Sequence, residues 1–355
     1  NWSKSPLIYE INTWVWLGEL SRTYRRPVNL ATVPEQEWDS IASLGFDAVW
    51  FMGVWERSPA GIEISMRNEG LLQDFRRALP DFSATDNVGS PYCVRRYAVD
   101  EHLGGPSGLA SARERLAERG LRLILDFVPN HMAPDHPWVA EHPDWFVAGN
   151  EELLAHQPQN WARAATRTGG RVLAYGRDPY FDGWPYTFQL NYGSPGLQEA
   201  MLGELKRIAT QCDGVRCDMA MLVLPEVFER TWGIASAPFW PRVTSEVRTA
   251  APGFLFLAEV YWDLEWTLQQ QGFDYTYDKR LYDRLEHGAA RPAREHLLAS
   301  PDFQDRSARF LENHDEPRAA ATFAPDAHRA AAVVTYFTPG LRFVHQGQRD
   351  LHRSL

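Results

Sequence analysis

Several apolar runs in this sequence of 355 residues contain or end in charged side chains, and these side chains could perform chemistry. They are Asp126 and His131 in and after 121–128, Arg216 and Asp218 in 214–218, Glu259 in 254–260, and His314 and Asp315 after 308–312. A charge is costly to bury without compensation, so a charged residue in a buried run requires a reason. Taken singly, each residue also fits a helix cap, a loop ion pair or a core histidine.

Three carboxylates with no cysteine and histidine cluster suit cleavage of a glycosidic bond, which needs one ionised and one protonated carboxyl group. Arg216 and Asp218 lie on one face of a strand, because side chains alternate with a period of two. A neighbouring guanidinium favours the charged form of a carboxyl group, which suits Asp218 to act as a nucleophile. The apolar run before Glu259 favours a raised pKa, which suits an acid.

The elements that must position these residues alternate between short apolar runs and helical segments. We expect strands over 7–16, 48–55, 121–128, 214–218, 254–260, 273–277, 308–312 and 341–345. We expect helices over 34–44, 107–119, 196–210, around 245–250, up to Leu285 and over 327–336. This alternation is typical of an α/β fold with a parallel sheet, and eight strands fit a (β/α)₈ TIM barrel. The carboxyl ends of barrel strands meet at one mouth, so Asp218, Glu259 and Asp315 should meet there.

One interval breaks this alternation, because about sixty residues separate the third strand from the next helix where a barrel loop is normally short. We therefore predict a barrel formed by residues 1–128 and 192–355, with an inserted subdomain over residues 129–191. The insertion contains Trp138, Trp145, Trp161 and Trp184, whose flat rings are candidates to stack on sugars. An aromatic-rich segment rarely stays unfolded, which argues against a disordered loop.

The composition excludes some functions. The net charge of −10 argues against nucleic acid as a partner, because phosphate binding needs a basic face. No apolar run is long enough to cross a membrane. Three cysteines favour a reducing compartment, hence the cytoplasm, or simple packing; the sequence leaves open whether a signal peptide has been removed. It does not predict an oligomeric state.

Four segments resemble, in the right order, the conserved regions of the α-amylase family (glycoside hydrolase family 13). They are Asp126-Phe-Val-Pro-Asn130-His131, Gly214-Val-Arg216-Cys-Asp218, Glu259-Val260 and Asn313-His314-Asp315. Gln189-Leu190-Asn191 resembles the motif that closes the family's inserted domain, and Ser90-Pro91-Tyr92 resembles the segment with a sugar-stacking tyrosine. The resemblance covers essentially the whole chain.

The resemblance implies a retaining hydrolase that acts on α-1,4-glucans or maltooligosaccharides by double displacement. It assigns the nucleophile to Asp218, the acid/base to Glu259 and the stabilisation of the transition state to Asp315. It further implies that Arg216 positions Asp218 and that His131 and His314 bind the sugar. Asp126 would support the wall of this sugar-binding site, and Tyr92 would stack on the sugar ring. Retention requires the carboxyl groups of Asp218 and Glu259 to lie about 5–5.5 Å apart.

Departures from the family pattern keep alternatives open. Many α-amylases carry Lys-His where this chain has Met221 and Leu222, which leaves room for an α-glucan transglycosylase that uses the same site. A non-catalytic carbohydrate-binding or scaffold member should have lost the carboxylates, which this chain keeps. The chain ends ten residues after His345, so we expect the family's C-terminal β-sandwich to be absent.

No cofactor is required by this chemistry. We expect no transition-metal site, because prolines place His131, His136 and His142 on irregular backbone. Calcium remains an open alternative at Asn130, a position that binds it in some relatives.

Overall fold

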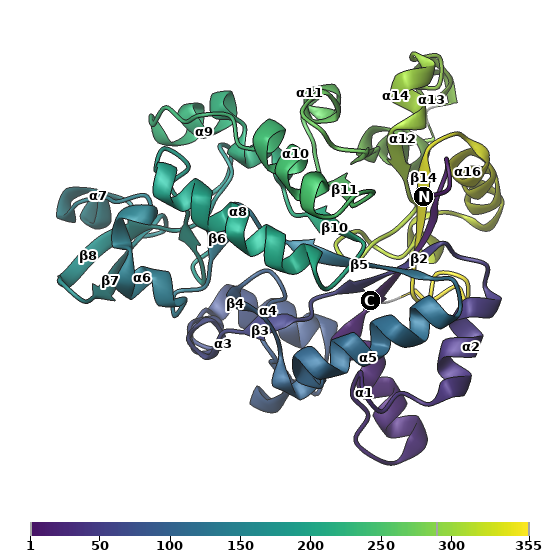
Figure 1. Ribbon diagram of the computed structural model, residues 1–355, viewed down its shortest axis with the longest axis horizontal. Coiled ribbons are helices and arrows are strands. Elements are labelled where there is room, and N and C mark those ends of the chain that lie inside the picture. Colours follow the sequence, from purple (N-terminus) through teal and green to yellow (C-terminus); the bar gives the residue numbers. More distant parts are fainter. Residues whose placement is uncertain (1, 289, 354–355) are drawn as a thin grey trace.

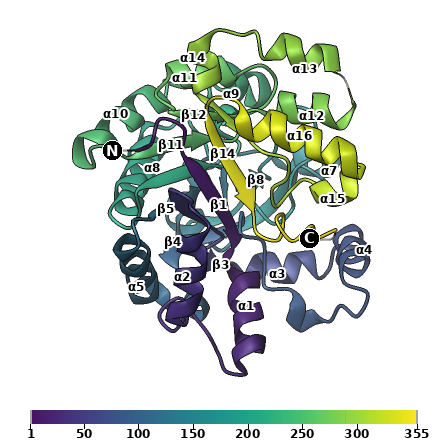
Figure 2. The same cartoon turned by 90° about the vertical axis from the view of Figure 1, so that its right-hand side faces the viewer.

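Eight parallel strands close into a barrel in the computed structural model, which describes residues 2–288 and 290–353 (Figure 1). The strands are β1 (Leu7–Asn12), β2 (Ala48–Met52), β5 (Arg122–Phe127), β10 (Gly214–Cys217), β11 (Leu255–Ala258), β12 (Tyr275–Tyr277), β13 (Ser307–Arg309) and β14 (Leu341–His345). They follow one another around the barrel in chain order, and β14 pairs with β1 to close it (Figure 2). The predicted (β/α)₈ TIM barrel is confirmed.

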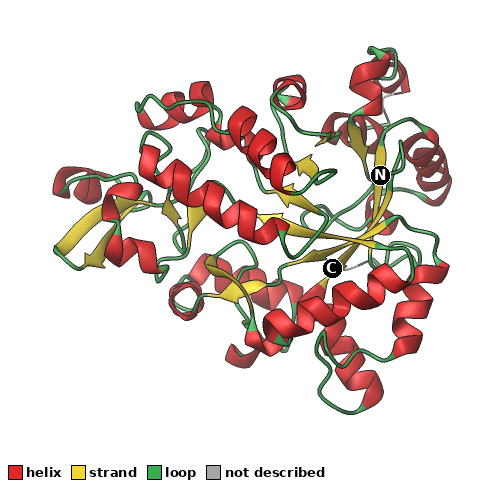
Figure 3. Cartoon of the chain, in the orientation of Figure 1, coloured by secondary structure: helices red, strands yellow, loops and turns green. Residues whose placement is uncertain are grey.

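Helices surround the barrel and cover its outer face (Figure 3). Those between the barrel strands and beside them are α1 (Thr13–Tyr24), α2 (Glu35–Ser43), α5 (Gly105–Glu118), α8 (Pro195–Ala209), α9 (Pro225–Trp232), α10 (Trp240–Ala250), α11 (Glu265–Gln270), α12 (Lys279–Glu286), α13 (Ala290–His296), α14 (Pro301–Asp305), α15 (Ala319–Thr322) and α16 (Pro325–Phe337). In the described part of the chain, no helix combines the length and the apolar character that crossing a membrane requires.

Side chains of the strands alternate between two apolar layers, which is why the strand sequences are almost continuously apolar. Ile8, Trp50 and Leu257 belong to the cluster inside the barrel. Val49 and Leu123 belong to the larger cluster between the strands and the helices. A polar side chain on the inward face is therefore enclosed on all sides, and its charge must be compensated locally.

Most predicted strands are shorter than expected; the run 308–312, for example, corresponds to the three-residue strand β13 (Ser307–Arg309). Two further runs end early for an evident reason. The run 7–16 is a strand only as far as Asn12, whose side chain accepts a hydrogen bond from the Val15 N–H and caps α1. The run 48–55 ends at Met52, because Gly53 turns the chain with a φ of +78°. The apolar residues beyond these points pack in other elements, so an apolar run alone did not mark the strand end.

The sequence analysis missed a second excursion, which lies between β2 and α5. It comprises β3 (Trp55–Arg57), α3 (Pro59–Ser65), α4 (Glu69–Ala78) and β4 (Val94–Val99). Strands β3 and β4 pair antiparallel, with Glu56 opposite Arg96. The Arg96 guanidinium forms an ion pair with Glu56 at 2.7 Å.

Between β5 and α8 the chain forms β6 (His131–Met132), α6 (Pro137–Glu141), α7 (Glu151–His156), β7 (Trp161–Thr166), β8 (Gly169–Ala174) and β9 (Phe188–Gln189). The β7–β8 hairpin extends away from the barrel (Figure 1). Strands β6 and β9 pair antiparallel, with His131 opposite Gln189. This pairing fixes both ends of the segment beside the carboxyl end of β5.

Gly214 offers a test of how tightly the barrel strands pack. A Cβ at this position would lie 2.9 Å from the carbonyl oxygen and from the Cβ of Leu255 on β11. We expect Gly214→Ala to lower the free energy of unfolding by about 1–3 kcal/mol, as overpacking does. The matched control is Gly203→Ala on the exposed face of α8, where nothing lies within 4 Å of an added Cβ.

The control should be stabilised by about 0.5–1 kcal/mol, because alanine is the better helix former. Urea unfolding followed by circular dichroism measures both variants. Equal stabilities for the two variants would contradict the strand packing described here.

Candidate active site

The centre of the barrel mouth is the guanidinium of Arg216, which is 0% exposed. Its Nη1 donates a hydrogen bond to Asp218 Oδ1 at 2.8 Å, and its Nη2 donates to Glu259 Oε2 at 2.8 Å. Strand β10 places Arg216 on its inward face and ends one residue before Asp218, just as β11 ends one residue before Glu259. One cation therefore joins two of the three predicted catalytic carboxylates.

Glu259 is held by three donors. Besides Arg216, the main-chain N–H of Met219 donates to Oε2 at 2.9 Å, and the Tyr261 hydroxyl donates to Oε1 at 2.7 Å. Met219 has a φ of +43°, a left-handed conformation that is uncommon for residues other than glycine. Since Oε2 already accepts from two N–H groups, a proton on Glu259 belongs on Oε1.

Asp126 lies beside Arg216, because the two residues are register partners on the neighbouring strands β5 and β10. Its Oδ1 lies 3.7 Å from Arg216 Nη1, and its Oδ2 accepts a hydrogen bond from the Gly53 N–H at 3.0 Å. Asp126 is 1% exposed, and burial raises its pKa while Arg216 acts to lower it. The structure thus places Asp126 beside Arg216.

His314 joins the third predicted carboxylate to the site. Its Nε2 lies 3.1 Å from Asp315 Oδ2 and 2.8 Å from the Tyr92 hydroxyl, and its ring stacks on that of Tyr92. Its Nδ1 lies 2.6 Å from Oε1 of Glu10, a residue on β1. The Asp315 side chain is 56% exposed, so this carboxylate faces the open mouth. Four polar side chains from three segments meet here.

His131 lies behind Tyr92. Its Nε2 is 3.0 Å from the Tyr92 carbonyl oxygen, which can only accept, so Nε2 carries the proton. Burial lowers the pKa of His131 to about 4, which keeps the ring neutral. This geometry commits the Nε2–H to Tyr92, and sugar binding by His131 stays a prediction. The Trp184 ring lies 5.2 Å from the His131 ring.

The other three insertion tryptophans pack against protein rings. Trp138 and Trp145 meet edge to face at 5.1 Å, and Trp161 meets Trp232 of α9 at 6.3 Å. Trp161 is 8% exposed. Of the four candidates for stacking on sugars, the structure places Trp184 next to a predicted site residue.

The three predicted catalytic carboxyl groups have shifted pKa values. Burial raises the pKa of Glu259 to about 7, against the effect of Arg216 and with the help of the Asp218 charge. Burial also raises the pKa of Asp218 from its ordinary value, while Arg216 acts to lower it. Burial acts to raise the pKa of Asp315, but the hydrogen bond from His314 outweighs it and the pKa is lowered. Of these three, Glu259 thus has a pKa near neutral pH, as an acid catalyst requires.

With this geometry established, comparison with known proteins assigns the family. A family model described as the α-amylase catalytic domain matches residues 35–351. The chain belongs to the α-amylase family.

Individual relatives within the family are distant. The α-amylase MalA of Haloarcula japonica is 23% identical over 365 aligned residues, which span 98% of this chain and 44% of that protein. The trehalose synthase/amylase TreS of Mycobacterium tuberculosis (strain H37Rv) is 25% identical over 319 residues, which span 78% of this chain and 46% of that protein. The chain therefore spans less than half the length of both.

A solved structure shares the fold. The noncanonic maltogenic α-amylase AmyB from Thermotoga neapolitana superposes with a TM-score of 0.69 at 21% identity. The match covers 99% of this chain and 70% of that one.

Sequence reasoning missed two residues of this α-amylase-family site. Glu10 is 0% exposed, and its signal was a carboxylate within the apolar run of the first strand. Tyr261 follows Glu259 by two residues, but nothing in the spacing pointed to a hydrogen bond with Glu259 Oε1. Met221 and Leu222, where many α-amylases carry Lys-His, are 0% and 3% exposed and belong to the core.

The predicted histidines do not converge. His136 caps α6, and His142 stacks on Trp145. Within residues 2–288 and 290–353, no group of three or more His, Cys, Asp or Glu side chains could hold a metal ion. Asn130 Oδ1 accepts a hydrogen bond from Gln189 Nε2 at 3.0 Å, so this oxygen already has a protein donor. Calcium at Asn130 stays a prediction, and no step below depends on it.

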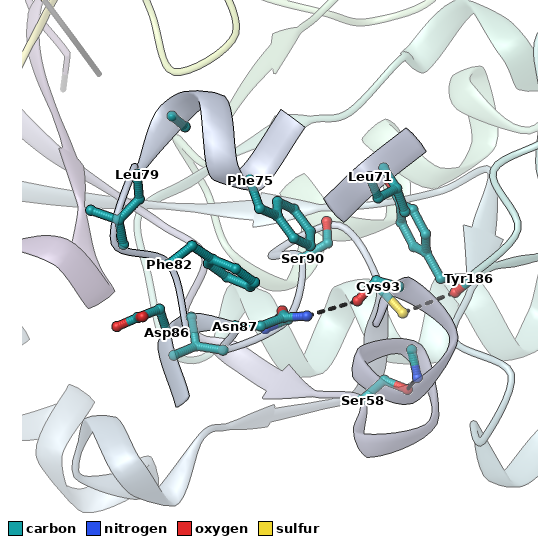
Figure 4. Close-up of a pocket in the computed structure, with 15 residues that line it drawn as sticks. Ser58, Leu71, Phe75, Leu79, Phe82, Asp86, Asn87, Ser90, Cys93 and Tyr186 are labelled. Carbon is teal, nitrogen blue, oxygen red and sulfur yellow. Dashed lines mark hydrogen bonds between the residues drawn. The ribbon is translucent and has the colours of Figure 1, made fainter. Parts of the chain in front are cut away.

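An apolar cavity of about 430 Å³ is lined by residues of α3, of α4 and of the segment 82–93 (Figure 4). Its walls include Leu71 and Phe75 of α4, together with Phe82. Cys93 lies at one end, and its thiol donates a hydrogen bond to the Tyr186 carbonyl at 3.0 Å (Figure 4). None of the site carboxylates described above lines this cavity, so it is separate from the Arg216 cluster.

The shared guanidinium predicts a stability effect that depends on pH. Replacing Arg216 by methionine leaves buried carboxylates uncompensated, which typically costs about 3–5 kcal/mol. Removing the guanidinium raises the folded-state pKa values of these carboxyl groups above their wild-type values. The loss therefore grows as the pH rises through the wild-type pKa, which is about 7 for Glu259, and shrinks at acidic pH. Urea unfolding at pH 5 and pH 8 measures the difference.

The matched control is Arg163→Met, which removes an exposed ion pair with Glu151 on α7 and should change stability little at either pH. A loss for Arg216→Met that is equal at pH 5 and pH 8 would contradict the electrostatic role of this guanidinium.

Proposed function

We propose that this chain cleaves α-glucosidic bonds of α-1,4-glucans or maltooligosaccharides with retention, by double displacement at the Arg216 cluster. The observation that carries the proposal is the pair of hydrogen bonds from one guanidinium to Asp218 and Glu259, both at 2.8 Å. Two carboxylates on one guanidinium lie close together, as retention requires, whereas an inverting pair is separated to admit a water molecule.

In the first step, an Asp218 carboxylate oxygen attacks the anomeric carbon while the glycosidic bond breaks. The proton on Glu259 Oε1 passes to the leaving oxygen, and a covalent glycosyl ester on Asp218 results. In the second step, Glu259 removes a proton from water, and the oxygen of that water displaces Asp218 from the anomeric carbon. Two inversions give net retention.

Neighbouring groups support these steps in the proposal. Arg216 keeps Asp218 ionised, because an adjacent cation favours the carboxylate. Asp315 binds sugar hydroxyl groups through bonds that strengthen in the transition state. His314, whose two ring nitrogens face Glu10 and Asp315, orients that carboxylate, and direct sugar binding by His314 stays a prediction. Tyr92 offers its ring as a stacking surface, and Asp126 supports the Arg216 wall.

The matched relatives support an α-glucan as substrate, since one is named an α-amylase and another a trehalose synthase/amylase. The three carboxylates that catalysis needs are all present, which argues against a non-catalytic binding or scaffold role.

Transfer to a sugar acceptor is the second candidate, and a specific observation favours it. Met221 and Leu222 are buried, so they supply no polar side chain to the leaving-group side where many α-amylases have Lys-His. In transfer, a sugar hydroxyl replaces water in the second step at the same carboxylates. Product analysis on maltoheptaose separates the candidates: glucose and short oligosaccharides indicate hydrolysis, whereas longer products indicate transfer.

The nucleophile assignment predicts the effect of one substitution. Asp218→Asn keeps the shape of the side chain but removes the attacking carboxylate, so kcat on maltoheptaose should fall by about 10⁴-fold or more. The control Asp302→Asn, exposed in the first turn of α14, should keep full activity. Undiminished turnover by a folded Asp218→Asn variant would refute the assignment.

The Tyr261 hydrogen bond predicts a shift in the pH profile. This bond stabilises the ionised form of Glu259 and so lowers its pKa, which burial raises to about 7. Activity that needs protonated Glu259 falls as the pH rises through this value. Removing the hydroxyl in Tyr261→Phe raises the pKa, so the alkaline limb of kcat/KM moves to higher pH by up to about one unit.

The control is Tyr24→Phe, which removes a surface hydroxyl bonded to Glu37 and should leave the limb in place. A limb that moves to lower pH in Tyr261→Phe would contradict the role of this hydrogen bond.

A further inference from the structure

We infer that Glu10 is a positioning residue that holds His314 as an imidazolium, with its Nε2–H aimed at Asp315 and Tyr92 in the sugar-binding wall. The inference rests on the proposed function, because it concerns how the wall binds the substrate. It adds a residue on β1 to a site otherwise built from the second and later strands.

The geometry around His314 carries this inference. Its Nδ1 lies 2.6 Å from Glu10 Oε1, and its Nε2 lies 3.1 Å from Asp315 Oδ2. Carboxylates are acceptors only, so a nitrogen facing one must carry a proton. A neutral imidazole carries one proton and would turn a lone pair toward one of the two carboxylates. A neutral ring could still accept at Nε2 from the Tyr92 hydroxyl 2.8 Å away, but its lone pair would also face Asp315. The doubly protonated ring donates to both carboxylates.

Glu10 has little else to compensate its charge. Its side chain is 0% exposed, and its second oxygen, Oε2, has no hydrogen-bond partner among residues 2–288 and 290–353. On β1 it stands in register with Trp50 of β2 and His345 of β14, inside the barrel. An ionised carboxylate in such a place needs a cation, and His314 is the group in hydrogen-bond contact with it.

The elements packed around His314 bear other charged and titratable groups. Tyr92 stacks on it from the segment before β4, and Trp50 meets it edge to face at 5.7 Å. Asp126 on β5 attracts its positive charge, while Arg216 lies over the Tyr92 ring at 5.2 Å. On the opposite side, a cavity of about 90 Å³ is lined by His314 together with Glu19, Arg318, His345 and His352.

The balance among these groups favours the charged ring. Burial acts to lower the pKa of His314, but the hydrogen bonds to Asp315 and Glu10 outweigh it and raise the pKa to about 10. His314 in turn lowers the pKa of Asp315, which keeps that carboxylate ionised and ready to accept from sugar hydroxyls. Glu10 thus acts on the substrate through His314 and does not touch the reacting atoms.

The test uses Glu10→Gln, which keeps an oxygen that can accept from Nδ1–H but removes the charge. Without that charge the pKa of His314 should fall by about one to three pH units. With ordinary substrates, the loss of activity caused by deprotonation of His314 cannot be seen, because deprotonation of Glu259 already limits their turnover near pH 7. α-Maltosyl fluoride avoids this limit, since fluoride leaves as an anion and needs no proton from Glu259.

With this substrate we expect wild-type kcat/KM to stay level from pH 7.5 to 9. For Glu10→Gln it should fall over the same interval as His314 loses its proton, by about twofold if the pKa drops one unit and by about twentyfold if it drops three. Glu114→Gln, exposed on α5, is the matched control and should follow the wild type. A level profile for Glu10→Gln would overturn the inference.

A double-mutant cycle separates action through His314 from a general structural effect. If Glu10 works through His314, adding Glu10→Gln to His314→Gln should change activity by less than about twofold. If the double variant instead loses activity by the product of the factors measured for the two single variants, the inference is overturned.

Nuclear magnetic resonance of ¹⁵N-histidine-labelled wild-type protein tests the charge directly, even where a variant fails to fold. The His314 signals, identified by their absence in His314→Gln, should show an imidazolium at pH 8.5; a neutral ring would overturn the inference. If the wild type does not turn over α-maltosyl fluoride at all, the proposed function fails, while this titration still tests the role of Glu10.

Discussion

The buried guanidinium of Arg216 is the constraint on which the rest of the site depends. It is enclosed by the rings of Trp50, Tyr92 and Tyr277 at 5.2–5.6 Å and hydrogen-bonded to two carboxylates. Its own side chain is 0% exposed, and those of its partners Asp218 and Glu259 are 10% and 5% exposed. A buried cation must be matched by anions, and buried anions by a cation. The closed barrel provides this enclosure because eight strands bring residues that are distant in sequence to one mouth.

A second set of charged side chains, Glu10, His314 and Asp315, also pairs opposite charges, on the open side of the mouth. Glu10, His314 and Asp315 alternate in charge from the barrel interior toward solvent, and Tyr92 lies between this row and the Arg216 cluster. The side chain of Asp315 is 56% exposed while Glu10 is 0% exposed. The arrangement combines a desolvated interior, which raises the pKa of Glu259, with one accessible carboxylate that can meet a substrate.

Much of this site was predictable from sequence, for a specific reason. Asp126, Arg216 and Glu259 interrupt or end strands that are otherwise apolar, and parallel topology brings such residues together whatever their spacing in the chain. Glu10 was not recognised because its partner His314 lies 304 positions away, and Tyr261 because its role depends on where one hydroxyl points. The β3–β4 excursion was missed because strands of three and six residues form only through their mutual pairing.

The central claim is that Asp218, held by Arg216, attacks the anomeric carbon. Trapping with 5-fluoro-α-glucosyl fluoride tests it most directly, because the ring fluorine slows release of the glycosyl ester while fluoride leaves readily. Mass spectrometry of the intact and digested protein should find one covalent sugar, on the peptide that carries Asp218. An adduct on another residue, or turnover of an oligosaccharide with inversion of the anomeric carbon, would contradict the account.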